Sequence, residues 1–135
     1  MSTLLPLQYC PCQSGLGFDD CCGPLIARHR KAPTAVALMR SRYTAFCVGD
    51  ADYLIYSWDP LTAPPLVDID PSISWTGLEV LSTTHGGLMD SNGLVHFKAH
   101  YTIAAAGHAP RHETLEELSV FRRFQGRWVY SSALK

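Results

Sequence analysis

The chain has 135 residues, of which 47% are hydrophobic and 17% are charged, and its formal net charge is −1 at pH 7. These values predict one ordinary globular domain with room for a small appendage, and they exclude an intrinsically disordered chain. The near-neutral charge gives no general attraction for nucleic acid or an anionic membrane, and no apolar run approaches the ~20 residues that span a bilayer. The opening segment, MSTLLPLQYCPC, has no basic or apolar leader pattern, so we expect no signal peptide and a cytoplasmic protein.

The first feature along the chain is a cluster of four of the five cysteines: Cys10, Cys12, Cys21 and Cys22. In a reducing compartment, clustered cysteines are metal ligands or redox groups more often than disulfides. Zinc prefers four soft ligands in a tetrahedron, and the flexible Ser14-Gly15 segment allows the two pairs of thiols to converge. The spacing favours one structural zinc ion per chain, because four protein ligands leave no position for a substrate.

Other interpretations of this region stay open. The adjacent Cys21 and Cys22 could form a labile disulfide that responds to oxidants, and the four residues could also be separate thiols. An iron–sulfur cluster is less well supported, because the usual C-x₂-C spacing is absent. The basic run 28–31 either offsets the charge of four thiolates or is a solvated surface segment. Cys47 lies apart from the cluster and is interpreted as a small buried hydrophobic residue.

Two helices are predicted next. Thr34 suits the N-cap of the first helix, apolar residues follow at three-and-four spacing, and Gly49 suits its end. Asp50 can cap a second, short helix. The segment 59–72 carries four of the nine prolines, so we expect a loop or extended connection there.

The remainder predicts an antiparallel meander of about four strands. Residues 93–107 alternate clearly and residues 74–86 alternate weakly. In residues 111–125 the segment ETLEEL also suits a helix, but the following GRWVYSSAL, which Gly126 turns into a fourth strand, favours a third strand there. The alternation predicts that Val95, Phe97 and Ala99 share the inner face, and that His96, Lys98 and His100 face solvent. Helices followed by a run of strands are typical of an α+β fold.

The cysteine segment CPCQSGLGFDDCCG resembles the SEC-C motif, a short zinc-binding module named from the SecA translocase. Ser14, Gly15 and Gly23 also match this motif, whereas Gln13 stands where glycine is more usual. With the segments MRSRYTAFCVGDADYL and EELSVFRRFQGRWVYS, nearly the whole chain resembles the YchJ-type family of small bacterial proteins. In that family, one SEC-C motif precedes a domain of the nuclear-transport-factor-2-like (NTF2-like) fold.

The resemblance implies a division of the chain near residue 32, where the composition also changes. Residues 1–31 would form the SEC-C zinc-binding module and residues 32–135 the NTF2-like α+β domain. The expected domain is cone-shaped: a curved antiparallel sheet with helices packed on its concave side. The resemblance implies no particular reaction.

A second site is expected inside the cone, where NTF2-like domains often hold a pocket. Its six candidate residues are Arg42, Tyr43, Trp58, Trp75, Glu117 and Ser119. Glu117 could act as an acid–base group in an apolar cavity. It could equally form a buried ion pair with Arg42 or Arg40, because burying an unpaired carboxylate is costly, and the aromatic residues could simply be core.

Three functions follow from these features. SEC-C modules in other proteins resemble tags that contact proteins or ribosomes, so the leading hypothesis is an adaptor with structural zinc and a protein or ribonucleoprotein partner. The alternative is a small-molecule-binding protein or an enzyme that uses the cone pocket, with Glu117 as the acid or base. The third is a redox-responsive protein that uses Cys21 and Cys22.

Overall fold

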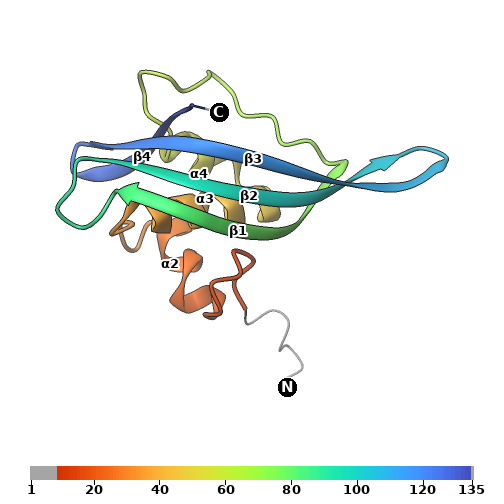
Figure 1. Cartoon of the computed structure of the whole chain (residues 1–135), viewed down its shortest axis with the longest axis horizontal. Coiled ribbons are helices and arrows are strands. Elements are labelled where there is room, and N and C mark those ends of the chain that lie inside the picture. Colours follow the sequence, from red (N-terminus) through yellow and green to blue (C-terminus); the bar gives the residue numbers. More distant parts are fainter. Residues whose placement is uncertain (1–8, 135) are drawn as a thin grey trace.

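The structure is a computed structural model, and it describes residues 9–134. Its elements in chain order are η2 (Phe18–Asp20), α2 (Cys22–Ile26), α3 (Ala35–Val48), α4 (Ala51–Tyr56), β1 (Ile73–His85), β2 (Asn92–Ala105), β3 (His108–Phe124) and β4 (Arg127–Ala133). This order confirms the predicted α+β class, with helices first and strands afterwards (Figure 1). The expectation of a chain start without a signal peptide concerns residues 1–8, which lie outside the described residues.

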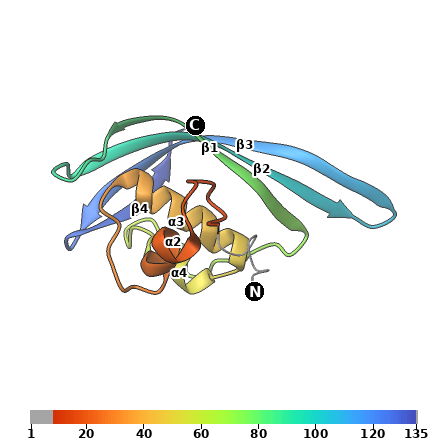
Figure 2. The ribbon, with the colours of Figure 1, turned by 90° about the horizontal axis from the view of Figure 1, so that it is seen from below.

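The four strands form one antiparallel sheet in the order β1-β2-β3-β4. The sheet is strongly curved and the helices lie on its concave side, as the family resemblance implied (Figure 2). Register shifts between Trp75 and Gly77 and between Val80 and Ser82 interrupt the pairing of β1 with β2. Bulges of this kind increase the local bend and twist of a strand, so they suit a sheet that wraps around helices.

The ends of the helices follow the predicted signals. The Thr34 side chain accepts a hydrogen bond from the Ala37 N–H at 3.1 Å, and Gly49 ends α3 in the left-handed region with φ 77°. The Asp50 carboxylate accepts a bond from the Tyr53 N–H at 2.9 Å and so caps α4. Each cap satisfies a backbone group that the helix itself leaves unpaired.

The core lies between α3 and the inner face of the sheet. The predicted inner residues Val95, Phe97 and Ala99 are all buried, which confirms the alternation in β2. His96 and His100 lie on the outer face, where they contact Glu116 and Glu79 respectively, each at 2.7 Å. Within the described residues, no helix is both long enough and apolar enough to cross a membrane.

The proline-rich connection 59–72 contains no helix or strand, as predicted, and its start is fixed to the sheet. Asp59 is buried and accepts hydrogen bonds from Arg122 Nε at 2.5 Å and from Arg122 Nη2 at 2.6 Å. The hydroxyl of Ser131 donates a further bond to Asp59 at 3.1 Å. The Arg122 guanidinium lowers the pKa of Asp59 to about 2, so this carboxylate stays charged in the folded protein.

Candidate metal centre and cone cavity

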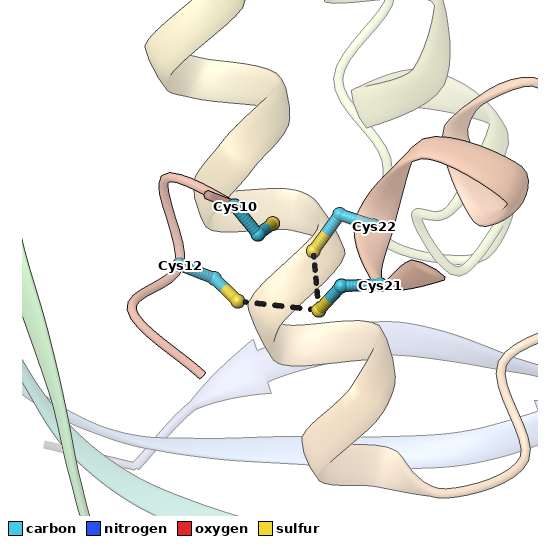
Figure 3. Close-up of side chains that lie close together, drawn as sticks. All are labelled: Cys10, Cys12, Cys21 and Cys22. Atoms are coloured by element: carbon cyan, nitrogen blue, oxygen red, sulfur yellow. Dashed lines mark hydrogen bonds between the residues drawn. The ribbon is translucent and has the colours of Figure 1, made fainter. Parts of the chain in front are cut away.

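The four clustered cysteines point toward one another from two short segments of the chain (Figure 3). Their Sγ atoms all lie within 4.8 Å of one another, with 3.6 Å between Cys12 and Cys21 and 3.9 Å between Cys21 and Cys22. Four thiolates around a tetrahedral ion at about 2.3 Å would lie about 3.8 Å apart. The geometry therefore fits a metal ion held by four sulfur ligands.

The loop that carries the first two cysteines is held by its own backbone. The Cys10 N–H donates to Leu16 O at 2.9 Å, and the Leu16 N–H donates to Ser14 Oγ at 3.2 Å. Ser14 Oγ also lies 3.2 Å from Cys21 Sγ, so the same hydroxyl connects the loop to the second pair of sulfurs. At Gly23, an added Cβ would lie 2.8 Å from Phe18 O, so only glycine allows the close turn into α2.

The cluster is closed to solvent on most sides. Cys10, Cys12 and Cys22 are buried and Cys21 is half-buried. Hydrogen bonds from the Cys10 and Cys22 thiols lower the pKa of Cys12 far below its usual range. The pKa of Cys22 is raised instead, because the Cys22 thiol is hydrogen-bonded to Cys10 and Cys12. Four sulfurs this close cannot all carry a negative charge unless a cation lies between them.

Helix α3 supports the cluster through residues that the sequence did not single out for this role. Arg40 Nη1 donates to Cys12 O at 2.8 Å, and Thr44 Oγ1 lies 3.6 Å from Cys10 Sγ. Arg40 and Thr44 are four residues apart and so share one face of the helix, which was the signal in the sequence that they could contact the same neighbour. The residues of the basic run 28–31 lie in different surroundings. Arg28 stacks over the Tyr56 ring at 4.6 Å, whereas Arg30 and Lys31 line a groove beside the cluster.

Gln13, the residue that departs from the SEC-C pattern, has φ 64°. This left-handed conformation explains why glycine is the more usual residue at the position. The glutamine side chain makes a contact that glycine could not, because its Oε1 accepts a hydrogen bond from the Leu78 N–H at 3.0 Å. The departure thus connects the cysteine module to β1.

The six residues expected inside the cone line one cavity of about 330 Å³. The other lining residues are Met39, Phe46, Phe97, Ala99, Leu115, Phe121 and Tyr130. The aromatic rings pack against one another as well as facing the cavity; Trp75, for example, lies 6.1 Å from Tyr43 and 5.1 Å from Tyr101 between ring centroids. The same aromatic residues therefore both pack in the core and line the cavity.

Glu117 faces this cavity, but the predicted ion pair with Arg42 or Arg40 is wrong. The carboxylate instead accepts hydrogen bonds at Oε2 from Ser119 Oγ at 2.5 Å and from Tyr130 OH at 3.2 Å. Two hydroxyl groups thus take the place of the expected cation. Burial, followed by the nearby Glu117 charge, raises the pKa of Tyr130 to about 12, so its hydroxyl stays protonated and can donate.

Arg42 is the most deeply placed charge of the cavity. Its Nη1 donates to Leu54 O at 2.8 Å and to Ser57 Oγ at 2.7 Å, which fixes α3 against the end of α4. Its guanidinium carbon lies 4.8 Å from the Trp58 ring centroid and 4.7 Å from that of Tyr130. Burial lowers the pKa of Arg42 to about 10, which leaves the group charged at neutral pH.

The chain is similar to proteins of a known bacterial family. A family model described as "YchJ, middle NTF2-like domain" matches residues 34–133. A UPF0225 protein of Streptomyces coelicolor is 43% identical over 127 residues, which is 94% of this chain and 95% of the relative. A UPF0225 protein of Corynebacterium glutamicum is 46% identical over 123 residues, or 91% of this chain and 94% of the relative.

Two solved structures share the architecture. A SEC-C motif containing protein from Rhodopseudomonas palustris has a TM-score of 0.76 at 36% identity, over 92% of this chain and 95% of that one. A SEC-C motif containing protein from Psychrobacter arcticus has a TM-score of 0.72 at 26% identity, over 96% of this chain and 84% of that one. The chain therefore belongs to the YchJ-type UPF0225 family, in which a SEC-C motif accompanies an NTF2-like domain.

Proposed function

We propose that this protein binds a small, mainly apolar molecule in its cone and that a structural zinc ion holds the module beside it. The observation that carries the binding role is the cavity of about 330 Å³, with an aromatic wall and two charged residues. Small-molecule sites are typically concave and apolar, with a few polar groups that orient the ligand, and their volumes begin at about 300 Å³. The cavity satisfies each of these conditions.

Zinc is the proposed ion because all four donors are sulfur and their spacing suits a tetrahedron. With four protein ligands, the ion would contribute folding energy and take no part in a reaction. Metal analysis of the purified protein should give about one zinc per chain, and chelation should lower the unfolding temperature. A metal-free protein that unfolds at the same temperature would overturn the structural role.

A filled-cavity variant tests the binding role. Ala99 lines the cavity, so Ala99→Leu should occupy space that a ligand needs. Ala104→Leu is the matched control, because Ala104 lies on the same strand and is exposed. Neutral indole should shift the indole N–H resonances of Trp58 and Trp75 in the wild type and in the control, but not in Ala99→Leu. Shifts that are equal in all three proteins, or absent from the wild type, would contradict the proposal.

The adaptor role is a second proposal, and the groove beside the cysteine cluster favours it. Arg30, Lys31 and Arg40 lie there next to the apolar residues Leu25 and Val36. By charge complementarity, this groove suits a partner segment that combines acidic and apolar side chains.

Synthetic peptides test the adaptor role directly. Peptides that alternate glutamate with leucine should bind better than peptides that alternate lysine with leucine, and the double variant Arg30→Glu/Lys31→Glu should remove this preference. Equal binding of both peptides to the wild-type protein would count against the role. Acid–base catalysis by Glu117 and a redox response of Cys21 and Cys22 stay predictions; the two sulfurs lie 3.9 Å apart as free thiols.

A further inference from the structure

We propose that the ligand of the cone cavity is a small ring-containing carboxylic acid whose carboxylate binds Arg42 and whose ring lies against the aromatic wall. This inference rests on the proposed binding function and adds the chemical class of the ligand. It starts from an imbalance in the cavity. Arg42 is 6% exposed and charged, yet within residues 9–134 no carboxylate lies within ion-pair distance of its guanidinium.

Arg42 lines the cavity and keeps two of its nitrogens without a partner in residues 9–134. Its hydrogen bonds to Leu54 and Ser57 both use Nη1, which leaves Nε and Nη2 without a partner among the described residues. These two nitrogens are not sealed in protein, because in the described part of the chain only Arg127 Nε is both fully enclosed and unpartnered. The space beside Arg42 is the cavity that it lines. Two adjacent N–H groups of a guanidinium match the two oxygens of a carboxylate.

A buried charge needs compensation, and the protein supplies only part of it. The Trp58 and Tyr130 rings offer their faces to the guanidinium, which is a weaker interaction than a hydrogen-bonded ion pair. Glu117 is nearby but its bound oxygen is occupied by Ser119 and Tyr130. An anionic ligand group would therefore complete a site that is electrostatically incomplete without it.

Glu117 selects further among such acids. Its Oε1 has no hydrogen-bond partner in the described part of the chain, while both hydroxyl bonds go to Oε2. Tyr130 contacts both charged groups: the Arg42 guanidinium lies over its ring, and its hydroxyl donates to Glu117. A ligand that carries a hydroxyl group in addition to its carboxylate can satisfy both. The ring of the ligand, which lies between its carboxylate and its hydroxyl group, would pack against the aromatic and aliphatic side chains of the cavity wall.

Four small probes test this assignment on the 135-residue chain loaded with zinc: para-hydroxyphenylacetate, its amide, phenylacetate and tyramine. The indole N–H signals of Trp58 and Trp75 report binding in the cavity, and that of Trp128 is an internal control because Trp128 bonds to Pro33 O outside it. We expect para-hydroxyphenylacetate to bind about tenfold more tightly than its neutral amide, since one charge-assisted bond is worth about that factor. Tyramine, which replaces the acid with a cation, should bind most weakly.

Variants locate the two contacts. Arg42→Gln should abolish the preference for the acid over the amide, and Arg42→Lys should retain part of it if the glutamine variant does not fold. Glu117→Gln should reduce the preference for para-hydroxyphenylacetate over phenylacetate, whereas Glu116→Gln on the outer face should not. An amide that binds as well as the acid would overturn the inference. If indole still binds the wild type in that case, the proposed function stands and only the ligand class is wrong; if no probe binds, both fail.

Discussion

The cysteine module and the cone cavity lie on either side of α3 but differ in how completely their polar groups are satisfied. In the module, four sulfurs converge on one point, and backbone and hydroxyl groups hold the loop that carries them. In the cavity, Arg42 and Glu117 each keep atoms that have no partner among residues 9–134. A metal site in which the protein supplies every ligand is suited to stabilise the fold, whereas a cavity with free hydrogen-bond donors and acceptors is suited to bind a small molecule.

The largest expected effect comes from breaking the module. Cys22→Ser removes one of the four sulfurs that we propose bind zinc, from a side chain that is 1% exposed, so the free energy of unfolding should fall by about 4 kcal/mol or more. Thermal denaturation and zinc content measure the two consequences together. Cys47→Ala is the matched control, because Cys47 lies outside the cluster; it should keep its zinc. A stable Cys22→Ser protein with unchanged zinc content would contradict the closed site.

A second prediction concerns the ion pair that fixes the start of the proline-rich connection. Asp59→Asn should lower the free energy of unfolding by about 2 kcal/mol near neutral pH, because it removes a charged partner of Arg122. The Asp59 pKa is about 2 in the folded protein and about 4 in an unfolded chain. The unfolded state therefore takes up the proton first as pH falls.

The stability that this charge contributes is present above pH ~4 and is lost as the pH falls toward ~2. The difference between wild type and Asp59→Asn should shrink across this window in denaturant titrations. Asp68→Asn, an exposed position in the same connection, should differ little from wild type at any pH. A difference that stays constant with pH would show that the carboxylate charge is not responsible.

Tyr130→Phe tests the polar wall of the cavity with a smaller change. It removes the hydroxyl that donates to Glu117 Oε2 and leaves the aromatic ring, so we expect a loss of about 1 kcal/mol in the free energy of unfolding. Tyr101→Phe is the control, since its hydroxyl has no hydrogen bond within the described residues. If both variants lose the same stability, Tyr130 does not hold the carboxylate.

The smallest effect is expected at the contact between the two regions. Gln13→Ala keeps the left-handed backbone and loses the hydrogen bond from Leu78, so it should cost about 0.8 kcal/mol. Gln13→Gly loses the same bond but relieves the strain, so its stability should lie within about 0.5 kcal/mol of wild type. Chemical denaturation of the two variants separates strain from bonding. If the alanine variant is as stable as the glycine variant, strain at this position is negligible.

Local signals in the sequence were sufficient for much of the fold. The caps at Thr34 and Asp50 and the alternation along β2 are consequences of short-range chemistry, so they could be predicted one element at a time. The convergence of the sulfurs was also predictable, because their spacing restricts the geometry that a single short loop can adopt. Glu117, which was expected inside the cone, lines the cavity.

The partners of the buried charges could not be predicted in this way. Glu117 meets hydroxyls from Ser119 and Tyr130 rather than an arginine, because the β3–β4 register brings Tyr130 opposite Phe121 and near the carboxylate. Arg40 contacts a backbone carbonyl of Cys12, far away in the sequence. Such contacts depend on the relative position of separate elements, which residue spacing along one element does not determine.

The most direct test compares both regions in one titration. In cadmium-substituted protein, the metal resonance reports the four cysteines, and the three indole N–H signals report the cone. Adding para-hydroxyphenylacetate should shift Trp58 and Trp75, leave Trp128 in place and leave the metal resonance unchanged. A ligand that moves the metal resonance, or that shifts Trp128 as much as the two cavity tryptophans, would contradict the division between a closed structural site and an open binding site.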